Sequence, residues 1–175
     1  MPASVIIRDA TAGDAIAVAA IYAPHVLSGT ATFETVAPSA GEMRARIAAC
    51  QTGSGAWLVA EAGGAVIGYA YCSQFRDRPA YRHTAEASIY VAANAHRRGI
   101  GRQLMAALID AAIARGFRQL IAVIGDSANA ASIGLHTTSG FRHAGLLSRV
   151  GRKFGRWLDV VYMQRGIGAG ETPPE

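Results

Sequence analysis

The sequence predicts an α/β fold, a single domain in which a mixed, twisted β-sheet is flanked by helices. Three observations support this prediction. Apolar segments with strand-like and helix-like spacing follow one another along the chain in the order β-α-α-β-β-β-α-β-α-β-β. No internal repeat or linker divides the 175 residues, a length that suits one domain with a sizeable core. Hydrophobic residues make up 51% and charged residues 17%, which argues against overall disorder.

The first third of the chain is expected to form one strand and two helices. Residues 5–8 predict a short strand. Residues 11–14 (Thr-Ala-Gly-Asp) have the form of a capping box with Asp in place of Glu, and they open a helical run over 16–22 that should end near Pro24. The range 39–50 begins with Ser-Ala-Gly-Glu, a second capping box, and therefore predicts another helix.

The middle of the chain is expected to supply three strands. Residues 56–61 and 65–73 are apolar runs joined by Ala-Gly-Gly, which predicts a β-hairpin. Residues 76–83 are polar and contain a proline, so they should form a loop. Residues 84–91 predict the third strand.

A long helix and a run of shorter elements are expected after these strands. Residues 99–115 place Leu104, Leu108 and Ala111 on one helical face, and Gly116 suits the helix end. The elements expected next are a strand at 119–124, a short helix at 129–139, and strands at 141–149 and 157–164. The domain should cover residues 1–165, and residues 166–175 should form a flexible tail.

Positive charge is concentrated in the second half of the chain. Residues 1–95 carry a net charge of −1, residues 96–165 carry +8 and the last ten carry −2. An anionic partner, either nucleic acid or a polyphosphate cofactor, is therefore expected to bind the second half. Of the 17 basic residues, 16 are Arg, whose planar fork suits phosphate and carboxylate, although a genomic bias toward Arg is an alternative explanation.

Targeting and redox signals favour a cytoplasmic protein. No apolar run reaches the roughly 18 residues that a membrane span needs, and the start of the sequence lacks the pattern of a signal peptide. Cys50 and Cys72 have neither metal-binding nor redox spacing. The sequence therefore predicts a reduced protein with no metal, no membrane segment and a cytoplasmic location.

Residues 91–102 predict an anion-binding turn between a strand and a helix. The first amides of the helix point at one spot, the helix dipole adds partial positive charge, and Gly99 and Gly101 allow a ligand to approach closely. Three arginines add full charges nearby: Arg97, Arg98 and Arg102. The segment lacks the patterns of a P-loop and of a Rossmann turn, so a pyrophosphate cradle of another kind is expected. The alternative is a basic helix start that packs for structural reasons.

This turn resembles the acetyl-CoA signature Gln/Arg-x-x-Gly-x-Gly/Ala of the GNAT acetyltransferase superfamily. His96 departs from the signature, which has Gln or Arg at its first position. The element order over residues 4–165 is also similar to the GNAT fold. The resemblance implies acetyl-CoA as co-substrate and no metal, with the diphosphate held by six consecutive residues: Arg97, Arg98, Gly99, Ile100, Gly101 and Arg102.

A closer resemblance is to the phosphinothricin and methionine sulfoximine acetyltransferase branch. The segments that carry it are Thr-Ala-Thr-Phe at 30–33, Tyr-Arg-His-Thr-Ala-Glu at 81–86, Ser-Ile-Tyr-Val at 88–91, Asn-Ala-Ala-Ser at 129–132, Leu-His at 135–136 and Lys-Phe-Gly-Arg-Trp-Leu-Asp at 153–159. The resemblance implies a homodimer that acetylates the α-amino group of a small amino-acid-like substrate. A block at 153–159 is expected to border the acceptor pocket or a subunit interface, which Trp157 would suit.

Glu86 is the candidate general base for acetyl transfer. On an alternating strand it shares one face with Ser88 and Tyr90. A carboxylate in a strand of apolar and small residues is unusual, because isolated burial of a charge is unfavourable. A solvated edge residue is the alternative, but the resemblance implies a base that acts through a water molecule.

The resemblance assigns cofactor contacts to two further segments. A splayed strand end, Ile89, Tyr90 and Val91, would hold the pantetheine, with the Val91 N–H as oxyanion donor. Asn129 and Ser132 would also bind the cofactor, although Asn129 suits a helix N-cap equally well.

The remaining assignments concern His136 and the acceptor. His136 is the candidate second acid/base group, with a structural or solvated histidine as the alternative. Arg78, Tyr81 and Arg82 would bind the acceptor's carboxylate, unless they form a solvated basic loop. Phe33 would close the acceptor pocket, unless it belongs to the core.

Three other functions compete with this interpretation. A nucleic-acid-binding module is disfavoured because the basic residues are not interleaved with aromatic stacking platforms. A non-catalytic acetyl-CoA-binding regulator is disfavoured by the presence of both Glu86 and His136. An acceptor such as a protein N-terminus or another amine remains open, whereas a polyamine pocket should be acidic and the loop at 76–83 has one acid, Asp77.

Overall fold

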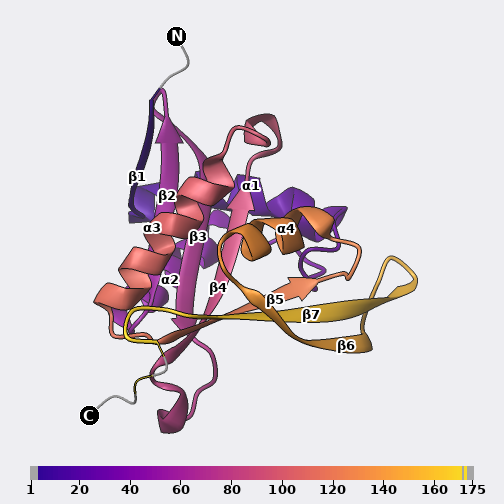
Figure 1. Cartoon of the computed structure of the whole chain (residues 1–175). Helices are drawn as coiled ribbons and strands as arrows, with labels where there is room; N and C mark the ends of the chain where they lie inside the picture. The colour runs from indigo at the N-terminus through magenta and orange to yellow at the C-terminus, as the bar shows by residue number, and fades with distance from the viewer. Residues whose placement is uncertain (1–3, 171, 173–175) are drawn as a thin grey trace.

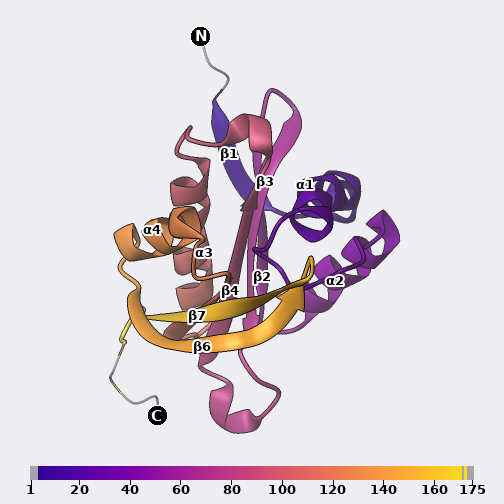
Figure 2. The same ribbon diagram turned by 90° about the vertical axis from the view of Figure 1, so that its right-hand side faces the viewer.

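The computed structural model describes residues 4–170 and 172, and these form a seven-stranded sheet with helices on both faces (Figures 1 and 2). The strands are β1 (Val5–Asp9), β2 (Ala56–Ala62), β3 (Ala65–Gln74), β4 (Thr84–Val91), β5 (Gln119–Gly125), β6 (Arg142–Lys153) and β7 (Arg156–Gly166). The α-helices are α1 (Ala15–Leu27), α2 (Ala40–Thr52), α3 (Ile100–Ala114) and α4 (Ala130–Thr138), with 3₁₀ turns at Ala12–Asp14, Pro79–Tyr81 and Ala93–Ala95. The predicted α/β class and element order are confirmed.

The helices divide between the two faces of the sheet. α1 and α2 cover one face, and α3 and α4 lie on the other (Figure 2). The core is divided in the same way: Leu104 and Leu108 of α3 are buried with Leu120 of β5, whereas Met43 and Ile47 of α2 are buried on the opposite face. Among the described residues no helix is long and apolar enough to cross a membrane.

The sheet follows the strand order β1-β2-β3-β4-β5-β7-β6 and contains one parallel pair, β4 with β5. That pair is short, because its register runs only from Thr84 opposite Gln119 to Ala87 opposite Ala122. Each strand continues beyond this point, with β4 paired to β3 and β5 paired to β7. The two halves of the sheet therefore diverge, and β5, β7 and β6 run across the direction of β1 to β4 (Figure 1).

Several element boundaries differ from the sequence prediction, and β6, expected at 141–149, continues to Lys153. α1 does not end near Pro24 but continues to Leu27, because the Pro24 carbonyl accepts hydrogen bonds from the Ser28 and Gly29 amides at 3.0 and 3.1 Å. The packed chain also extends past residue 165. β7 ends at Gly166, and the next side chain, Ile167, is buried with 3% exposure. Residues 171 and 173–175 of the predicted flexible tail lie outside the described residues.

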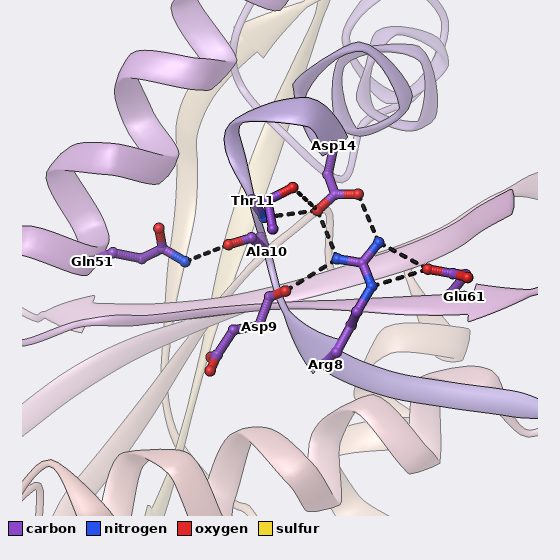
Figure 3. A network of polar contacts seen from close by, with 7 residues as sticks. All are labelled: Arg8, Asp9, Ala10, Thr11, Asp14, Gln51 and Glu61. Carbon is purple, nitrogen blue, oxygen red and sulfur yellow. Dashed lines mark hydrogen bonds and ion pairs between the residues drawn. The ribbon is translucent and has the colours of Figure 1, made fainter. Parts of the chain in front are cut away.

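A charged network joins the first strand to the start of α1 (Figure 3). The Arg8 guanidinium donates to both carboxylate oxygens of Asp14, at 2.8 and 2.9 Å, and to Glu61 at 2.9 Å. Asp14 is 7% exposed and also accepts from the amide and the hydroxyl of Thr11. The predicted capping contact of Asp14 is therefore combined with a partly buried ion pair, in which Arg8 is the chief cause that holds the pKa of Asp14 down at about 2.

Replacing Asp14 with Asn is expected to lower the free energy of unfolding by about 1.5–3 kcal/mol, because the variant leaves part of the Arg8 charge unpaired. Urea denaturation followed by the fluorescence of the buried Trp57 measures the change. Asp110→Asn, at an exposed position of α3, is the matched control. Equal midpoints for the two variants would contradict the assignment.

The same pair predicts a pH window for this contribution to stability. The folded-state pKa of Asp14 is depressed from 3.8 to about 2, so the contribution is present above the unfolded-state pKa and is lost as pH falls toward 2. The difference in stability between the wild type and Asp14→Asn should therefore shrink between about pH 4 and pH 2.

Candidate active site

A cleft of about 880 Å³ opens where β4 and β5 diverge. Its walls come from β4, β5, the turn after β4, the start of α3, helix α4 and the end of α1. The predicted site residues that line it are Ile89, Tyr90, Val91, Arg97, Gly99, Ile100, Gly101, Arg102, Asn129, Ser132 and His136. Two separate ranges of the sequence, 89–102 and 129–136, thus meet in one cavity.

The divergence leaves the end of β4 without a neighbour on one side. Residues Ile89, Tyr90 and Val91 have no partner on β5. The Ala92 amide donates to Ile67 on the β3 side at 2.9 Å, and successive strand amides alternate in direction. The Val91 amide therefore points to the opposite side, into the gap. On the same side, the Val91 carbonyl accepts a hydrogen bond from His96 Nε2 at 2.9 Å. His96, which replaces the Gln or Arg of the acetyl-CoA signature, therefore caps the end of β4.

The turn after β4 presents its backbone to the cleft. Arg97 and Gly99 both adopt left-handed conformations, with φ of 62° and 77°, and alternation of this kind turns neighbouring amides toward one point. α3 begins at Ile100, so the unpaired amides of its first turn and its positive dipole end face the same region. At Gly101, a Cβ would lie 3.3 Å from Leu135 of α4, so glycine permits the two helices to approach closely.

Helix α4 forms the opposite wall and begins at a capped asparagine. Asn129 Oδ1 accepts from the Ser132 amide at 3.2 Å, so the expected N-cap is present. Both residues also line the cleft. The cap holds the first turn of α4 against the cavity and leaves the Asn129 side-chain amide as a potential donor to a ligand.

His136 lies one turn further along α4 and is 3% exposed. Its Nδ1 is 2.8 Å from the Ser132 carbonyl, and a carbonyl can only accept, so Nδ1 carries the proton. Nε2 is buried and has no hydrogen-bond partner among the described residues. Burial lowers the pKa of the imidazole, against the opposing effect of the Ser132 carbonyl. His136 is therefore neutral at pH 7, with an unprotonated Nε2.

Glu86 lies on β4, half-buried, before the point of divergence. Burial raises the pKa of its carboxyl, and the charge of Arg76 acts in the opposite direction. Glu86 is not among the residues that line the cleft, but Ser88 and Tyr90, on the same face of the alternating strand, are. Sequence reasoning overlooked Arg76 in the same loop as Arg78, because nothing in its spacing sets it apart.

The predicted acceptor residues lie outside the lining of this cleft. Arg78, Tyr81 and Arg82 are exposed on the loop that enters β4 at Thr84, whereas the phosphate turn leaves β4 after Val91. Phe33 is in contact with Gly151 of β6, where a Cβ would come within 2.1 Å of its ring. Arg98 is exposed and also does not line the cleft.

Several lining residues were not predicted, and two of them come from a separate part of the chain. His25 and Ala31, from the end of α1 and the loop after it, form a further part of the wall. The His25 ring packs against Tyr90 with the ring centroids 5.1 Å apart. Ala31 belongs to the segment at 30–33 that carries the resemblance, but only Phe33 of that segment was assigned a role, and no motif marks His25. In the described part of the chain, no three His, Cys, Asp or Glu side chains are grouped to share a metal ion.

Comparison with known proteins identifies relatives that are acetyltransferases of the GNAT class. The model of the acetyltransferase (GNAT) domain matches residues 7–162. The chain is 50% identical to phosphinothricin N-acetyltransferase of Alcaligenes faecalis, covering 95% of this chain and 83% of that protein. It is 38% identical to the L-methionine sulfoximine/L-methionine sulfone acetyltransferase of Pseudomonas paraeruginosa, over 96% and 98% of the two chains.

A solved structure agrees closely with this fold. The phosphinothricin acetyltransferase of Sinorhizobium meliloti in complex with AcCoA aligns with a TM-score of 0.93 at 44% identity, covering 99% of this chain and 93% of that one. The chain belongs to the GNAT acetyltransferase family. It is an acyltransferase, and the resemblance found in the sequence is confirmed.

The His136 geometry predicts a distinctive NMR signature. In long-range ¹H–¹⁵N spectra its ring should show a protonated Nδ1 and an unprotonated Nε2, and should stay neutral to a pH below its usual pKa of 6.5. A His136→Gln variant assigns the signals. A Nε2-protonated tautomer, or a pKa above 6.5, would contradict the arrangement.

Proposed function

We propose that the protein is an acetyl-CoA-dependent N-acetyltransferase of the phosphinothricin and methionine sulfoximine type, which acetylates the α-amino group of a small amino-acid-like substrate. One observation carries the proposal: the turn at residues 97–102 directs unpaired helix amides into a cleft that diverging strands hold open. The names of the two relatives and the AcCoA complex of the Sinorhizobium meliloti protein support the choice of substrates.

The cofactor would lie along the cleft from the turn to the end of β4. The amides at the start of α3 would bind the diphosphate, with Arg97 and Arg102 adding charge from the lining and Arg98 from the surface. Asn129 and Ser132 would contact the cofactor from α4. Ile89 and Tyr90 would flank the pantetheine along β4.

The reaction requires a base, an oxyanion donor and an acid. Glu86, with its raised pKa, would take the proton of the attacking amine through a water molecule. The Val91 amide, which points into the gap, would donate to the carbonyl oxygen of the thioester as negative charge develops there. Acetyl transfer would then be direct, with the amine attacking the thioester carbon and the thiolate leaving.

His136 would act second, as a proton carrier. Because its Nε2 is unprotonated at neutral pH, it must first take up a proton before it can donate one to the departing thiolate. Its position on the cleft wall and its buried, unpartnered Nε2 support this role.

The acceptor's carboxylate would be bound by the loop between β3 and β4. Arg78 and Arg82 supply guanidinium groups and Tyr81 a hydroxyl, with Phe33 at the border of the pocket. Arg76 joins this set because its charge acts on Glu86. A basic loop favours an acceptor that carries a carboxylate or phosphinate over a polyamine.

We also propose a homodimer, located in the cytoplasm. The β6–β7 hairpin exposes five large apolar side chains, which supports a role in association: Leu146, Leu147, Val150, Phe154 and Trp157. The two cysteines are unpaired thiols, as suits a reducing compartment. Residues 1–165 are proposed to act as one catalytic domain.

The function is tested by thiol release from acetyl-CoA with a panel of amino acids, phosphinothricin, methionine sulfoximine and a peptide with a free N-terminus. Glu86→Gln should lower kcat/KM by about 100-fold or more, because general base catalysis is lost. Its affinity for coenzyme A, measured by calorimetry, should match that of the wild type and of the control Asp110→Asn. No affinity in the wild type would reject the function, and full turnover in Glu86→Gln would reject the base.

The pH profile provides a separate readout for Glu86. A base acts in its ionised form, so kcat/KM should fall as pH decreases through a pKa above the usual value of 4.5 for Glu. His136 titrates as well, so the profile is compared with that of His136→Gln to separate the two limbs.

The homodimer is tested at its exposed tryptophan. Trp157→Glu should shift sedimentation toward the monomer, because a buried unpaired carboxylate is unfavourable at an interface core. Arg142→Glu, an exposed position at the start of β6 outside the apolar set, is the control. A monomeric wild type, or a Trp157→Glu protein that remains dimeric, would contradict this interface.

A further inference from the structure

Helix α4 supplies one wall of the proposed cofactor cleft but has little apolar anchorage of its own. In this helix, which the structure describes in full, His136 is the one buried residue, and Ile133 and Leu135 are only partly covered. Nine residues are also fewer than an isolated helix needs to be stable. The position of α4 must therefore be fixed in large part by polar contacts at its two ends.

The loop before α4, residues 126–129, is organised by Asp126. Oδ1 of this residue accepts from the Ala128 amide at 3.0 Å, and its carbonyl accepts from the Asn129 amide at 3.0 Å. Asp126 adopts a left-handed conformation with φ of 68°, which Asp and Asn tolerate better than most residues other than glycine. The chain thus turns at Asp126 and brings Asn129 to the N-cap position of α4.

Asp126 also connects this loop to two other segments. Its Oδ2 accepts from Thr30 Oγ1 at 2.7 Å and pairs with Arg156 of β7 at 3.3 Å. Its amide donates to the Asp159 carbonyl at 2.9 Å. The Ala128 amide, followed by the Thr30 hydroxyl, holds the pKa of the Asp126 carboxyl below its usual value, so the group is ionised at neutral pH. One carboxylate therefore joins the start of α4 to the segment after α1 and to β7.

Strand β7 holds both ends of α4. On the N-terminal side, besides its contacts with Asp126, β7 accepts a hydrogen bond from Ser127 Oγ at Asp159 Oδ2, at 2.8 Å. On the C-terminal side, the Arg165 guanidinium donates to the Ser139 carbonyl. The last carbonyls of a helix lack partners within it, and the dipole favours a cation at this end. The helix is thus tied to one strand at its start and at its finish.

The wall that these contacts hold is the one assigned to the cofactor. Asn129, Ser132 and His136 line the cleft, whereas Asp126 and Arg165 are not among its lining residues. A change at either of these two positions would therefore act on a bound cofactor only through the placement of α4.

We propose that Asp126 and Arg165 are positioning residues, which hold the two ends of α4 so that its cleft-lining face meets the cofactor. The inference rests on the proposed acetyltransferase function and deepens it, because it places determinants of coenzyme A affinity outside the cleft. Neither residue touches the reacting atoms.

The experiment measures coenzyme A affinity by calorimetry and amide hydrogen exchange in the free protein. Asp126→Gly accepts the left-handed conformation but lacks the carboxylate. Asp126→Asn accepts the same conformation and retains a side-chain oxygen for the Ala128 amide. Arg165→Met removes the contact at the other end of α4. The matched controls are Asp9→Gly at the end of β1 and Arg142→Met at the start of β6, both at exposed positions.

Asp126→Gly and Arg165→Met should each weaken coenzyme A binding by about tenfold or more, because α4 is no longer held in its binding position. Exchange should become faster in residues 130–139 and stay unchanged in α3. Asp126→Asn should recover most of the affinity. A merely structural role would lower the unfolding midpoint and leave the affinity of the folded protein as it was.

Each outcome decides the proposal. Coenzyme A affinity equal to that of the matched control, in either Asp126→Gly or Arg165→Met, would overturn it, as would an Asp126→Asn protein that binds no better than Asp126→Gly. If Asp126→Gly does not fold, Arg165→Met decides alone. A wild type with no affinity for coenzyme A would remove the proposed function itself, and that failure is seen before any variant is made.

Discussion

The structure depends on the short parallel pairing between β4 and β5. It lasts for four residues on each strand, and after Ala87 and Ala122 each strand keeps only its antiparallel partner. Backbone amides and carbonyls exposed by such a gap would be unfavourable in a closed core, so the gap must face solvent or a ligand. Here it faces a cleft that the turn after β4 and helix α4 complete. The unpaired backbone of β4 is thus available to form hydrogen bonds with a ligand in the cleft.

Burial shifts the pKa values of the two proposed acid/base groups, Glu86 and His136, in opposite directions. It disfavours the charged form of each, so the pKa of the Glu86 carboxyl rises and the pKa of the His136 imidazole falls. The two values therefore move toward each other. A proton that passes between amine, carboxylate, imidazole and thiolate needs donors and acceptors of similar affinity, since large differences would trap it.

Sequence patterns predicted what is encoded locally. The turn at 97–102 could be found because its glycines, charges and helix start are contiguous, and the capping box of Ser39 and Glu42 is present at 2.6 and 3.2 Å. The end of α1 was misplaced because one further turn is possible after a proline that loses a single amide donor. His25 and Arg76 were not predicted as site residues, because their relation to the site comes from the packing of α1 and of the loop before β4. Spacing along the chain carries no information about such contacts.

The segment at 153–159 shows why one motif can suggest two locations. Neighbouring residues on a strand point to opposite sides, so a short block can serve a pocket and a surface at once. Lys153 points inward to the carbonyls of the segment after α1, while Phe154 and Trp157 remain 55% and 61% exposed. Phe154 and Gly155 form the turn between β6 and β7, and both adopt left-handed conformations, so the chain reverses within two residues. The hairpin therefore presents exposed apolar side chains to one side and a buried ammonium group, bound to the segment after α1, to the other.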